Sequence, residues 1–275
     1  MAPAPGVPLP CGLPYRIDIS GPPPDALDFL VQLGALDVEP VTGGLAAILP
    51  DGVAPDLVAA ALNVPGVTVS PAVPRDNGSV WLVSPQTVRI GGLLIAPPDA
   101  CASGNALRLA DSRAFGTGRH PTTVLCVEAL EEILAHERPA AILDVGTGSG
   151  VLALAALLMG VPQATGLDID AAALAVAAEN ARLNHVADRL QLIQGGPGAV
   201  DGNWPLVVAN ILAAPLIEMA PVLVRRLGTH ARLILSGIPS SLESEVWQAY
   251  RHLGMRRTDS RTRAGWTVLI AQSSW

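Results

Sequence analysis

The residue pattern best suited to chemistry in this sequence is a glycine-rich turn between an apolar run and a helix-like segment. The apolar run covers residues 141–145 (AILDV), and the turn covers residues 146–150 (GTGSG). Glycines in such a turn let a ligand approach the backbone N–H groups at a helix N-terminus. A turn of this kind can also be a simple strand-to-helix connection, so the surrounding residues must decide between the two.

Two carboxylates near the turn make the signal more specific. Asp168 ends the next predicted strand, about twenty residues further on, where a carboxylate can accept both hydroxyls of a ribose. Asp144 directly precedes the glycines, close to where a dinucleotide would put its doubly charged pyrophosphate. Like charges at that range cost free energy, whereas a ligand with an ammonium and a sulfonium, as in S-adenosylmethionine, would be attracted. The alternative for Asp144 is a purely structural capping carboxylate.

These motifs resemble those of a known enzyme family. Residues 144–150 (DVGTGSG), followed by Asp168, resemble motifs one and two of the class I S-adenosylmethionine-dependent methyltransferases. Residues 114–123 (AFGTGRHPTT) and 210–213 (NILA) are similar to signatures of the PrmA family, and the resemblance runs from about residue 80 to the end. Members of that family methylate large-subunit ribosomal protein L11. The resemblance therefore implies transfer of methyl groups from S-adenosylmethionine to lysine side chains and the N-terminal amine of that protein.

The resemblance also implies which residues contact the methyl donor. By similarity these are Thr123, Gly146, Asp168 and Asn210. We add three residues from the same motifs. Asp144 would contribute charge, Gly148 would allow the loop conformation, and Thr117 would offer a hydroxyl group. The alternative for Thr122 or Thr123 is that it caps the predicted helix 122–136. We expect His120 to hold the adjoining loop by a hydrogen bond rather than to join the site.

We expect Asn210 to have a catalytic role, in which it positions the amine that accepts the methyl group. It follows an apolar run at the carboxyl end of a predicted parallel strand, where ligands bind in open α/β sheets. Methyltransferases that act on planar bases or amides resemble one another in an aromatic ring after this position, and residues 211–213 contain none. We therefore expect a flexible aliphatic amine, whose hydrogens the Asn210 carbonyl would orient. The sequence indicates no general base.

The C-terminal part of the chain alternates between helical and extended patterns, which predicts a mostly parallel sheet wrapped by helices. The predicted helices are 122–136, 149–159, 171–183, 213–226 and 240–252. The predicted strands are 141–145, 164–168, 190–194, 206–210, 231–236, 255–259 and 266–272, which suits the seven-stranded, Rossmann-like class I methyltransferase domain that the resemblance implies. We expect the last strand to run antiparallel at one edge. Asp170 should cap helix 171–183, on which Asn180 and Asn184 should form a polar face.

The N-terminal part follows the order β-α-β-β-α-β, which predicts a small α+β, ferredoxin-like domain with two helices on one face of an antiparallel sheet. The predicted elements are 15–20, 24–33, 35–39, 44–49, 55–62 and 66–70, and further extended stretches follow at 80–83 and 87–95. We expect a substrate-recognition domain over residues 1–95, a linker over 96–113, and the methyltransferase domain over 114–275.

Composition excludes several other classes. The chain has 275 residues, and its apolar stretches fall short of the roughly 18–20 residues that cross a bilayer. Its start lacks a secretion signal, so we expect a cytoplasmic protein without a membrane segment. The net charge is −7 and all 17 basic residues are arginine, so we expect no direct nucleic-acid binding. The three cysteines lack the paired spacing of a zinc site, so we expect no metal.

Ribosomal protein L11 is thus the expected partner, S-adenosylmethionine the expected cofactor, and a monomer the expected state. Three alternatives stay open at this point. The same catalytic domain could methylate lysines of another protein, or the chain could be a catalytically silent S-adenosylmethionine-binding module. A nicotinamide-dependent oxidoreductase is a third class, against which Asp144 and the glycine spacing argue.

Overall fold

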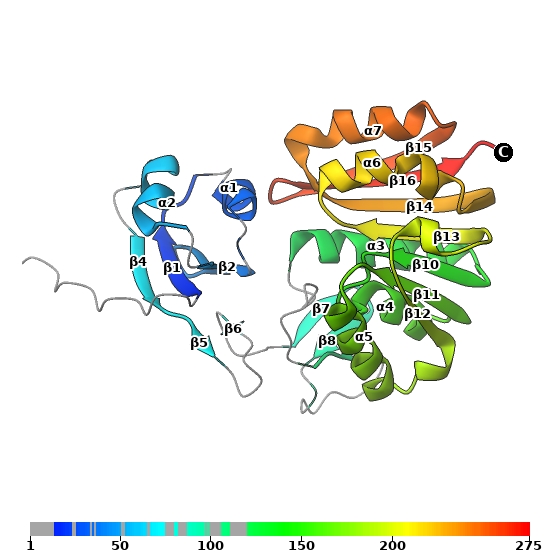
Figure 1. The fold of residues 1–275 in the computed structure, drawn as a ribbon, viewed down its shortest axis with the longest axis horizontal. Helices are drawn as coiled ribbons and strands as arrows, with labels where there is room; N and C mark the ends of the chain where they lie inside the picture. The colour runs from blue at the N-terminus through cyan, green and yellow to red at the C-terminus, as the bar shows by residue number, and fades with distance from the viewer. Residues whose placement is uncertain are drawn as a thin grey trace, which may run out of the picture. The chain divides into compact units, whose positions relative to one another are not determined.

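The computed structural model describes residues 14–23, 26–33, 35, 37–50, 53–64, 67–74, 80–81, 87–96, 98, 106–110 and 120–275. The chain divides into two compact units, Met1–Ser84 and Pro85–Trp275 (Figure 1). This boundary lies earlier than the linker expected over residues 96–113. The reason is that Ile90, Leu93 and Leu107 are buried in the core of the second unit, so the short strands around them belong there.

The first unit is a four-stranded antiparallel sheet with two helices. Its strands are β1 (Tyr15–Ser20), β2 (Asp37–Val41), β3 (Gly44–Leu49) and β4 (Val67–Pro71), and its helices are α1 (Ala26–Gln32) and α2 (Pro55–Ala61). The sheet order is β2-β3-β1-β4, with β1 pairing antiparallel to both of its neighbours. Alternate residues of β1, Ile17 and Ile19, are buried against Leu30 of α1 and Val58 of α2. A short pair, β5 (Val73–Pro74) and β6 (Val80–Trp81), follows.

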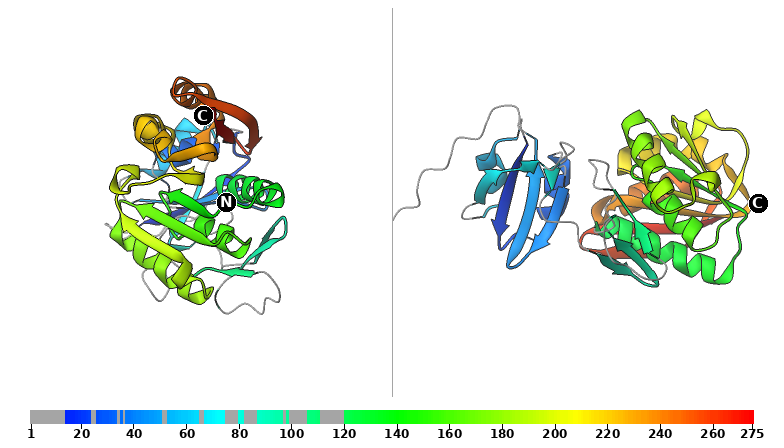
Figure 2. Two further views of the ribbon diagram at one scale, coloured as in Figure 1. Left: turned by 90° about the vertical axis from the view of Figure 1, so that its right-hand side faces the viewer. Right: turned by 90° about the horizontal axis from the view of Figure 1, so that it is seen from below.

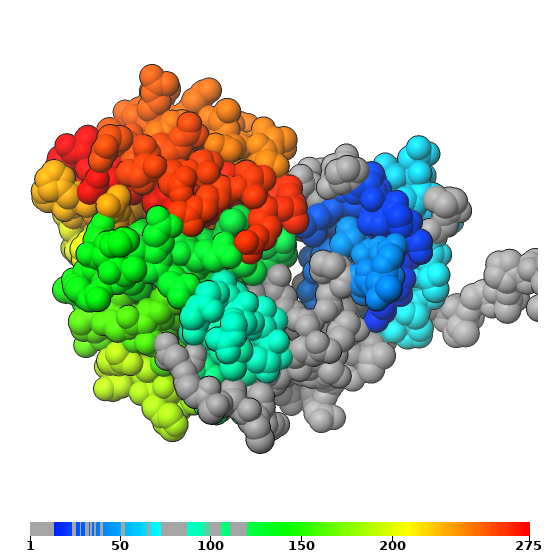
Figure 3. Space-filling model, turned by 180° about the vertical axis from the view of Figure 1, so that it is seen from behind, coloured from blue at the N-terminus to red at the C-terminus, as the bar shows by residue number. Residues whose placement is uncertain are grey.

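The second unit begins with a small three-stranded sheet. It consists of β7 (Val88–Ile90), β8 (Leu93–Ala96) and β9 (Ala106–Arg108), with β8 and β9 parallel. The sequence pattern predicted a single extended stretch over residues 87–95, but the chain turns at Gly91, where φ is +53°. The turn contacts the neighbouring helix, because the Gly92 N–H donates to Glu131 Oε1 at 2.8 Å. Figure 3 shows β7 and β8, in teal, against this green helix on the surface.

The main sheet has the order β12-β11-β10-β13-β14-β16-β15. Its strands are β10 (Ala141–Val145), β11 (Gln163–Asp168), β12 (Leu190–Gln194), β13 (Trp204–Asn210), β14 (Leu227–Pro239), β15 (Met255–Arg263) and β16 (Trp266–Ser273). The first five of that order pair in parallel. From β10 the chain adds strands first on one side and then, from β13, on the other. The carboxyl ends of β10 and β13 therefore form the switch point where ligands bind in such sheets.

Helices cover both faces of this sheet (Figures 1 and 2). They are α3 (Pro121–His136), α4 (Val151–Leu158), α5 (Ala171–Leu183), α6 (Ala213–Val224) and α7 (Glu243–Arg251), with short 3₁₀ turns at Ala187–Arg189, Pro197–Ala199 and Ser240–Leu242. Successive strand residues point to opposite faces. Ile142 and Val208 pack in the cluster with α3 and α4, whereas Leu143 and Val207 pack in the cluster with α6 and α7. Asp144 follows the parity of Ile142, which places its side chain on the α3 and α4 face.

The expectation that the last strand lies at the sheet edge is wrong. β16 runs antiparallel, but it lies between β14 and β15. Its first six residues are all buried, as an interior strand requires. The edge strand is β15, which carries Arg256, Arg257, Arg261 and Arg263, and charged side chains on an edge discourage pairing with another chain.

Candidate functional site

The glycine-rich turn follows β10 in a conformation that favours glycine. Gly146, Gly148 and Gly150 have φ values of +72°, +54° and +82°, a region that costs a residue with a Cβ roughly 1–2 kcal/mol. The N–H groups of Gly146 and Thr147 both donate to the Leu167 carbonyl at 2.8 Å, which fastens the turn to β11. The turn ends at Gly150, the residue that precedes α4.

Close packing gives a second reason for glycine at the start of this turn. A Cβ added to Gly146 would lie 2.3 Å from Cγ2 of Ile211, the residue after β13. The turn is therefore in direct contact with the end of the neighbouring strand. This contact joins the two strand ends at the switch point of the sheet.

Asp144 is buried beneath the turn, with its side chain 1% exposed. Its Oδ2 accepts hydrogen bonds from the Thr147 hydroxyl at 2.7 Å and from the Ala153 N–H, in the first turn of α4, at 3.1 Å. Its Oδ1 has no hydrogen-bond partner within the part of the chain that the structure describes. Burial raises the pKa of this carboxyl to about 6. One oxygen thus has the structural capping role, and the other is buried without a partner among the described residues.

Asp168 is joined to the same turn through its side chain. Its Oδ2 accepts from the Gly148 N–H at 2.9 Å, and its Oδ1 accepts from the Asp170 N–H at 3.0 Å. Each carboxylate oxygen has a second lone pair for a ligand hydroxyl. Asp170 has the capping role that the sequence predicted, because its Oδ1 accepts from the Ala172 N–H at 2.8 Å at the start of α5.

Asn210 is the last residue of β13, and β13 lies next to β10 in the sheet. Its side-chain Oδ1 is buried and without a partner among the described residues. Two large apolar side chains are exposed at the same strand ends: Ile169 after β11, at 79%, and Leu212 after Ile211, at 55%. The carboxyl edge of the sheet therefore combines buried acceptors with exposed apolar surface.

The N-terminus of α3 differs from the expected arrangement. The capping residue is His120, whose Nδ1 lies 2.7 Å from the Thr122 hydroxyl and accepts weakly from the Thr122 N–H at 3.4 Å. Thr122 and Thr123 lie inside the helix after the capping residue, so neither caps it, and both are fully buried. The helix begins at Pro121, one residue earlier than predicted. Thr117 and the rest of residues 111–119 lie outside the described residues.

His120 also contacts Trp266 at the start of β16, with ring centroids 5.0 Å apart in an edge-to-face arrangement. Burial lowers the pKa of His120 to about 4, so its ring is neutral near pH 7. The contact places the start of α3 beside β16. No residue pattern around Trp266 singled it out in the sequence, since the pairing depends on two elements far apart in the chain.

Unpartnered polar atoms concentrate around this edge of the sheet. In the described part of the chain, four buried side-chain polar atoms lack a partner: Thr123 Oγ1, Asp144 Oδ1, Asn210 Oδ1 and Trp266 Nε1. Leaving such an atom unpaired costs about 1–3 kcal/mol, so a concentration of them indicates a ligand site. The carboxylate and amide oxygens only accept, and the threonine hydroxyl can accept, which suits a ligand that carries positive charge and N–H groups.

Sequence analysis missed the role of two asparagines on α5. The two side chains were expected to form a polar face of the helix, but they do not lie at the surface, because Asn180 is fully buried and Asn184 is 9% exposed. The Asn180 side-chain amide donates to the Ser149 carbonyl in the glycine-rich turn at 2.8 Å. Alanines at 177 and 181, on the same side of the helix, are the one local signal that this face is buried.

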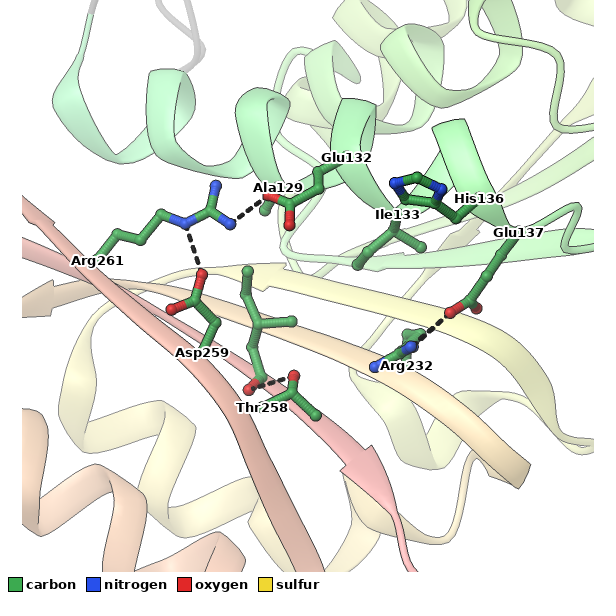
Figure 4. Close-up of a pocket in the computed structure, with 10 residues that line it drawn as sticks. Ala129, Glu132, Ile133, His136, Glu137, Arg232, Thr258, Asp259 and Arg261 are labelled. Carbon is green, nitrogen blue, oxygen red and sulfur yellow. Dashed lines mark hydrogen bonds and ion pairs between the residues drawn. The ribbon is translucent and has the colours of Figure 1, made fainter.

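A surface pocket lies away from these residues (Figure 4). It is lined by residues of α3, β14, β15 and β16, together with Glu137. Its charged groups pair with one another: Arg232 with Glu137 at 2.6 Å, and Arg261 with both Glu132 and Asp259. None of the predicted site residues lines it, and its ion pairs join α3 to the sheet. Neither in this pocket nor in the rest of the described residues does a cluster of side chains suited to a metal ion occur.

Comparison with known proteins gives consistent results. A family model described as "Ribosomal protein L11 methyltransferase (PrmA)" matches residues 81–274. A ribosomal protein L11 methyltransferase from Geotalea daltonii is 36% identical over 229 residues, which cover 78% of this chain and 72% of that protein. One from Myxococcus xanthus is 36% identical over 221 residues, covering 79% and 76%. A crystal structure of a ribosomal protein L11 methylase from Lactobacillus delbrueckii subsp. bulgaricus has a TM-score of 0.62 at 28% identity, covering 68% of this chain and 99% of that one.

Proposed function

The chain belongs to the ribosomal protein L11 methyltransferase (PrmA) family, and from this premise we propose that it transfers methyl groups from S-adenosylmethionine to amino groups of ribosomal protein L11. The observation that carries the proposal is the junction of Asp144, the glycine-rich turn and Asp168 at the switch point of the sheet. This junction lies within the residues that the family model matches.

The residues of the junction fit the methyl donor by their chemistry. Asp168 would accept the ribose hydroxyls, and Gly146 and Gly148 would let the donor approach the backbone. The unpartnered oxygens of Asp144 and Thr123 would face the positively charged amino-acid end of the donor. These assignments, with Thr117 in the signature at residues 114–123 and Asn210 on β13, complete the donor site that we propose. When bound, S-adenosylmethionine would supply a methyl group on a sulfonium sulfur. An amine nitrogen that attacks this methyl carbon displaces the sulfur as a neutral thioether.

The protein's contribution to the reaction is chiefly positioning. A protonated amine has no lone pair for the attack, so the acceptor must lose a proton and present its nitrogen toward the methyl group. The buried Oδ1 of Asn210 would accept a hydrogen from the amine and direct its lone pair, and this is the catalytic role that we assign to it. Holding the reacting atoms at about 3–3.5 Å supplies much of the acceleration. The exposed Leu212 offers apolar surface for an aliphatic stem.

We further propose that the first unit is a ferredoxin-like domain that recognises the protein substrate. Its strand order supports the fold assignment, because each helix connects two strands that flank an antiparallel third strand. Residues 1–84 contain eight acidic side chains and two arginines, so they carry six of the seven net negative charges of the chain. An acidic surface attracts a basic protein and raises its rate of association. The second unit would then be the methyltransferase domain.

The remaining assignments concern the state of the protein in the cell. We propose a monomer in the cytoplasm, where ribosomal proteins are made, without direct binding to nucleic acid. The net charge of −7 supports the last point, because binding to phosphates requires clustered positive charge. Within the described residues, no helix is long and apolar enough to cross a bilayer.

The experiment that tests the function is the intact mass of unmethylated bacterial ribosomal protein L11 after incubation with the purified chain and S-adenosylmethionine. We expect successive methyl increments, which Asp168→Ala removes and Asp170→Ala retains, since Asp170 caps α5. If the wild-type chain binds S-adenosylmethionine but adds no methyl group, the substrate assignment is wrong and the donor site stands. If it does not bind S-adenosylmethionine, the whole proposal fails.

A further inference from the structure

Asn180 joins two segments that lie far apart in the sequence. Its Nδ2 donates to the carbonyl of Ser149 in the glycine-rich turn at 2.8 Å. Its Oδ1 accepts from the N–H of Ala110, two residues after β9, at 2.7 Å. The side chain is fully buried, and both ends of its amide are used in these contacts. One planar amide therefore sets the separation between the turn and the segment that follows β9.

Asn184, one helical turn further along α5, binds the β9 segment and its own helix, and no other described residue. Its Oδ1 accepts from the Arg108 N–H at 2.8 Å, and its Nδ2 donates to the Arg108 carbonyl at 2.6 Å and to the Asn180 carbonyl at 2.7 Å. The two bonds to Arg108 are those that a neighbouring strand would make with β9. Leu107 and Leu109, on either side of Arg108, pack into the core with α3 and α4. Asn184 is thus a structural residue of the β9 segment.

The difference between the two asparagines is the contact with the glycine-rich turn. On the β11 side, the turn is held by bonds to the Leu167 carbonyl and the Asp168 carboxylate. On the α5 side, Asn180 donates a hydrogen bond to the Ser149 carbonyl, which is part of the peptide group between Ser149 and Gly150. Gly150 has a left-handed conformation at φ +82° and precedes α4. The orientation of this peptide group therefore affects both the turn and the first N–H groups of α4.

We propose that Asn180 is a positioning residue for the methyl-donor site. It holds the glycine-rich turn in the conformation that receives the donor before the donor arrives, and it makes no contact with the donor itself. Without this hydrogen bond, the turn samples other conformations, and donor binding must then select one of them. A site whose supporting residues are already ordered binds more tightly for that reason. This inference rests on the proposed function, because it concerns the same donor site.

The test compares two isosteric variants, Asn180→Asp and Asn184→Asp. Each replaces a buried side-chain NH₂ donor on α5 by a carboxylate oxygen and keeps the acceptor for the β9 segment, but only Asn180→Asp removes the bond to Ser149. For each variant, the affinity for S-adenosylmethionine is measured by calorimetric titration, and the midpoint of thermal unfolding is measured without ligand. Hydrogen exchange of the donor-free proteins over residues 146–154 reports the turn directly.

We expect Asn180→Asp to weaken binding about ten-fold or more, the equilibrium equivalent of one buried hydrogen bond. Exchange over the turn should also be faster in this variant. Both variants should lower the midpoint of thermal unfolding to a similar extent. The affinity of Asn184→Asp for S-adenosylmethionine should stay within about two-fold of the wild type, a change well below the effect of one hydrogen bond. Wild-type affinity in Asn180→Asp, or equal loss of affinity in both variants, would overturn the proposal.

A second pair of variants covers the case in which a buried carboxylate prevents folding. Asn180→Ala and Asn184→Ala remove the whole amide, including the acceptor for the β9 segment, without adding charge, and the same outcomes decide. The inference and the proposed function fail in different measurements. A wild-type chain that binds S-adenosylmethionine but does not methylate ribosomal protein L11 contradicts the function and leaves the comparison of variants intact. Equal exchange over residues 146–154 in donor-free Asn180→Ala and wild type contradicts the inference alone.

Discussion

Asp144→Asn is expected to make the donor-free protein more stable. The wild-type carboxylate is 1% exposed, and its Oδ1 has no partner among the described residues. In the variant, the amide oxygen can take the place of Oδ2 and accept from Thr147 and Ala153, while the NH₂ group takes the place of the unpartnered Oδ1. The variant therefore keeps the hydrogen bonds and removes a buried negative charge.

The size of this effect follows from the pKa of Asp144. Burial raises this pKa from 3.8 to about 6, and at 1.36 kcal/mol per unit the shift corresponds to about 3 kcal/mol. The folded state binds the proton more tightly than the unfolded state. The stability contributed by the protonated group is therefore complete below pH 3.8 and is lost as the pH rises through about 6. Of the 3 kcal/mol, about 1.4 kcal/mol is lost between pH 5 and pH 8.

The assay is urea denaturation of the donor-free wild type and Asp144→Asn at several values between pH 5 and pH 8. The variant should exceed the wild type in free energy of unfolding by about 3 kcal/mol at pH 8 and by about half of that at pH 5. His120, with its lowered pKa, occurs in both proteins and cancels in the difference. A variant that is less stable at pH 8, or a difference that does not change with pH, would refute the reasoning.

Three further predictions concern ligand binding and backbone conformation. Asp168→Ala should weaken S-adenosylmethionine binding about 10- to 100-fold, as loss of hydrogen bonds to a charged group implies, whereas Asp170→Ala should lower stability by about 1 kcal/mol and leave the affinity unchanged in the same titration. Gly146→Ala should lower the free energy of unfolding by more than the roughly 1–2 kcal/mol of its left-handed conformation, and adding Ile211→Ala should recover the excess, because the clashing Cγ2 is then absent. The affinity of the wild type for S-adenosylmethionine should rise as the pH increases through about 6, because ionised Asp144 attracts a cation, and titrations of Asp144→Asn should show no such rise.

The donor motif was the most accessible feature in the sequence, because its interactions are close along the chain. The turn at 146–150 needs glycine for local backbone reasons, and Asp168 reaches Gly148 because parallel strands joined by one helix end side by side. Asp170 as a helix cap also depends only on its neighbours. These features follow from backbone geometry over a few residues, which sequence reasoning can evaluate.

The features that sequence reasoning missed depend on contacts between distant segments. Asn180 and Asn184 have the spacing of an exposed helix face, but they are buried and bind backbone groups of Arg108 and Ala110, which lie far away in the sequence. The position of β16 between β14 and β15 depends on which strand can be buried on both faces, and four arginines on β15 exclude it from the interior. His120, rather than the threonine considered as an alternative, caps α3, and its ring packs against Trp266, which lies far away in the sequence.

The buried, unpartnered groups at the carboxyl edge link the stability of the fold to its function. Asp144 costs the donor-free protein about 3 kcal/mol near pH 8, although an asparagine would keep both of its hydrogen bonds. An amide has no net charge, however, and would not attract a cationic ligand. The carboxylate therefore lowers the stability of the donor-free protein but favours the binding of a ligand with a sulfonium and an ammonium. Asp144→Asn should therefore gain stability and lose donor affinity in the same protein, and a variant that gains both would show that the charge does not serve donor binding.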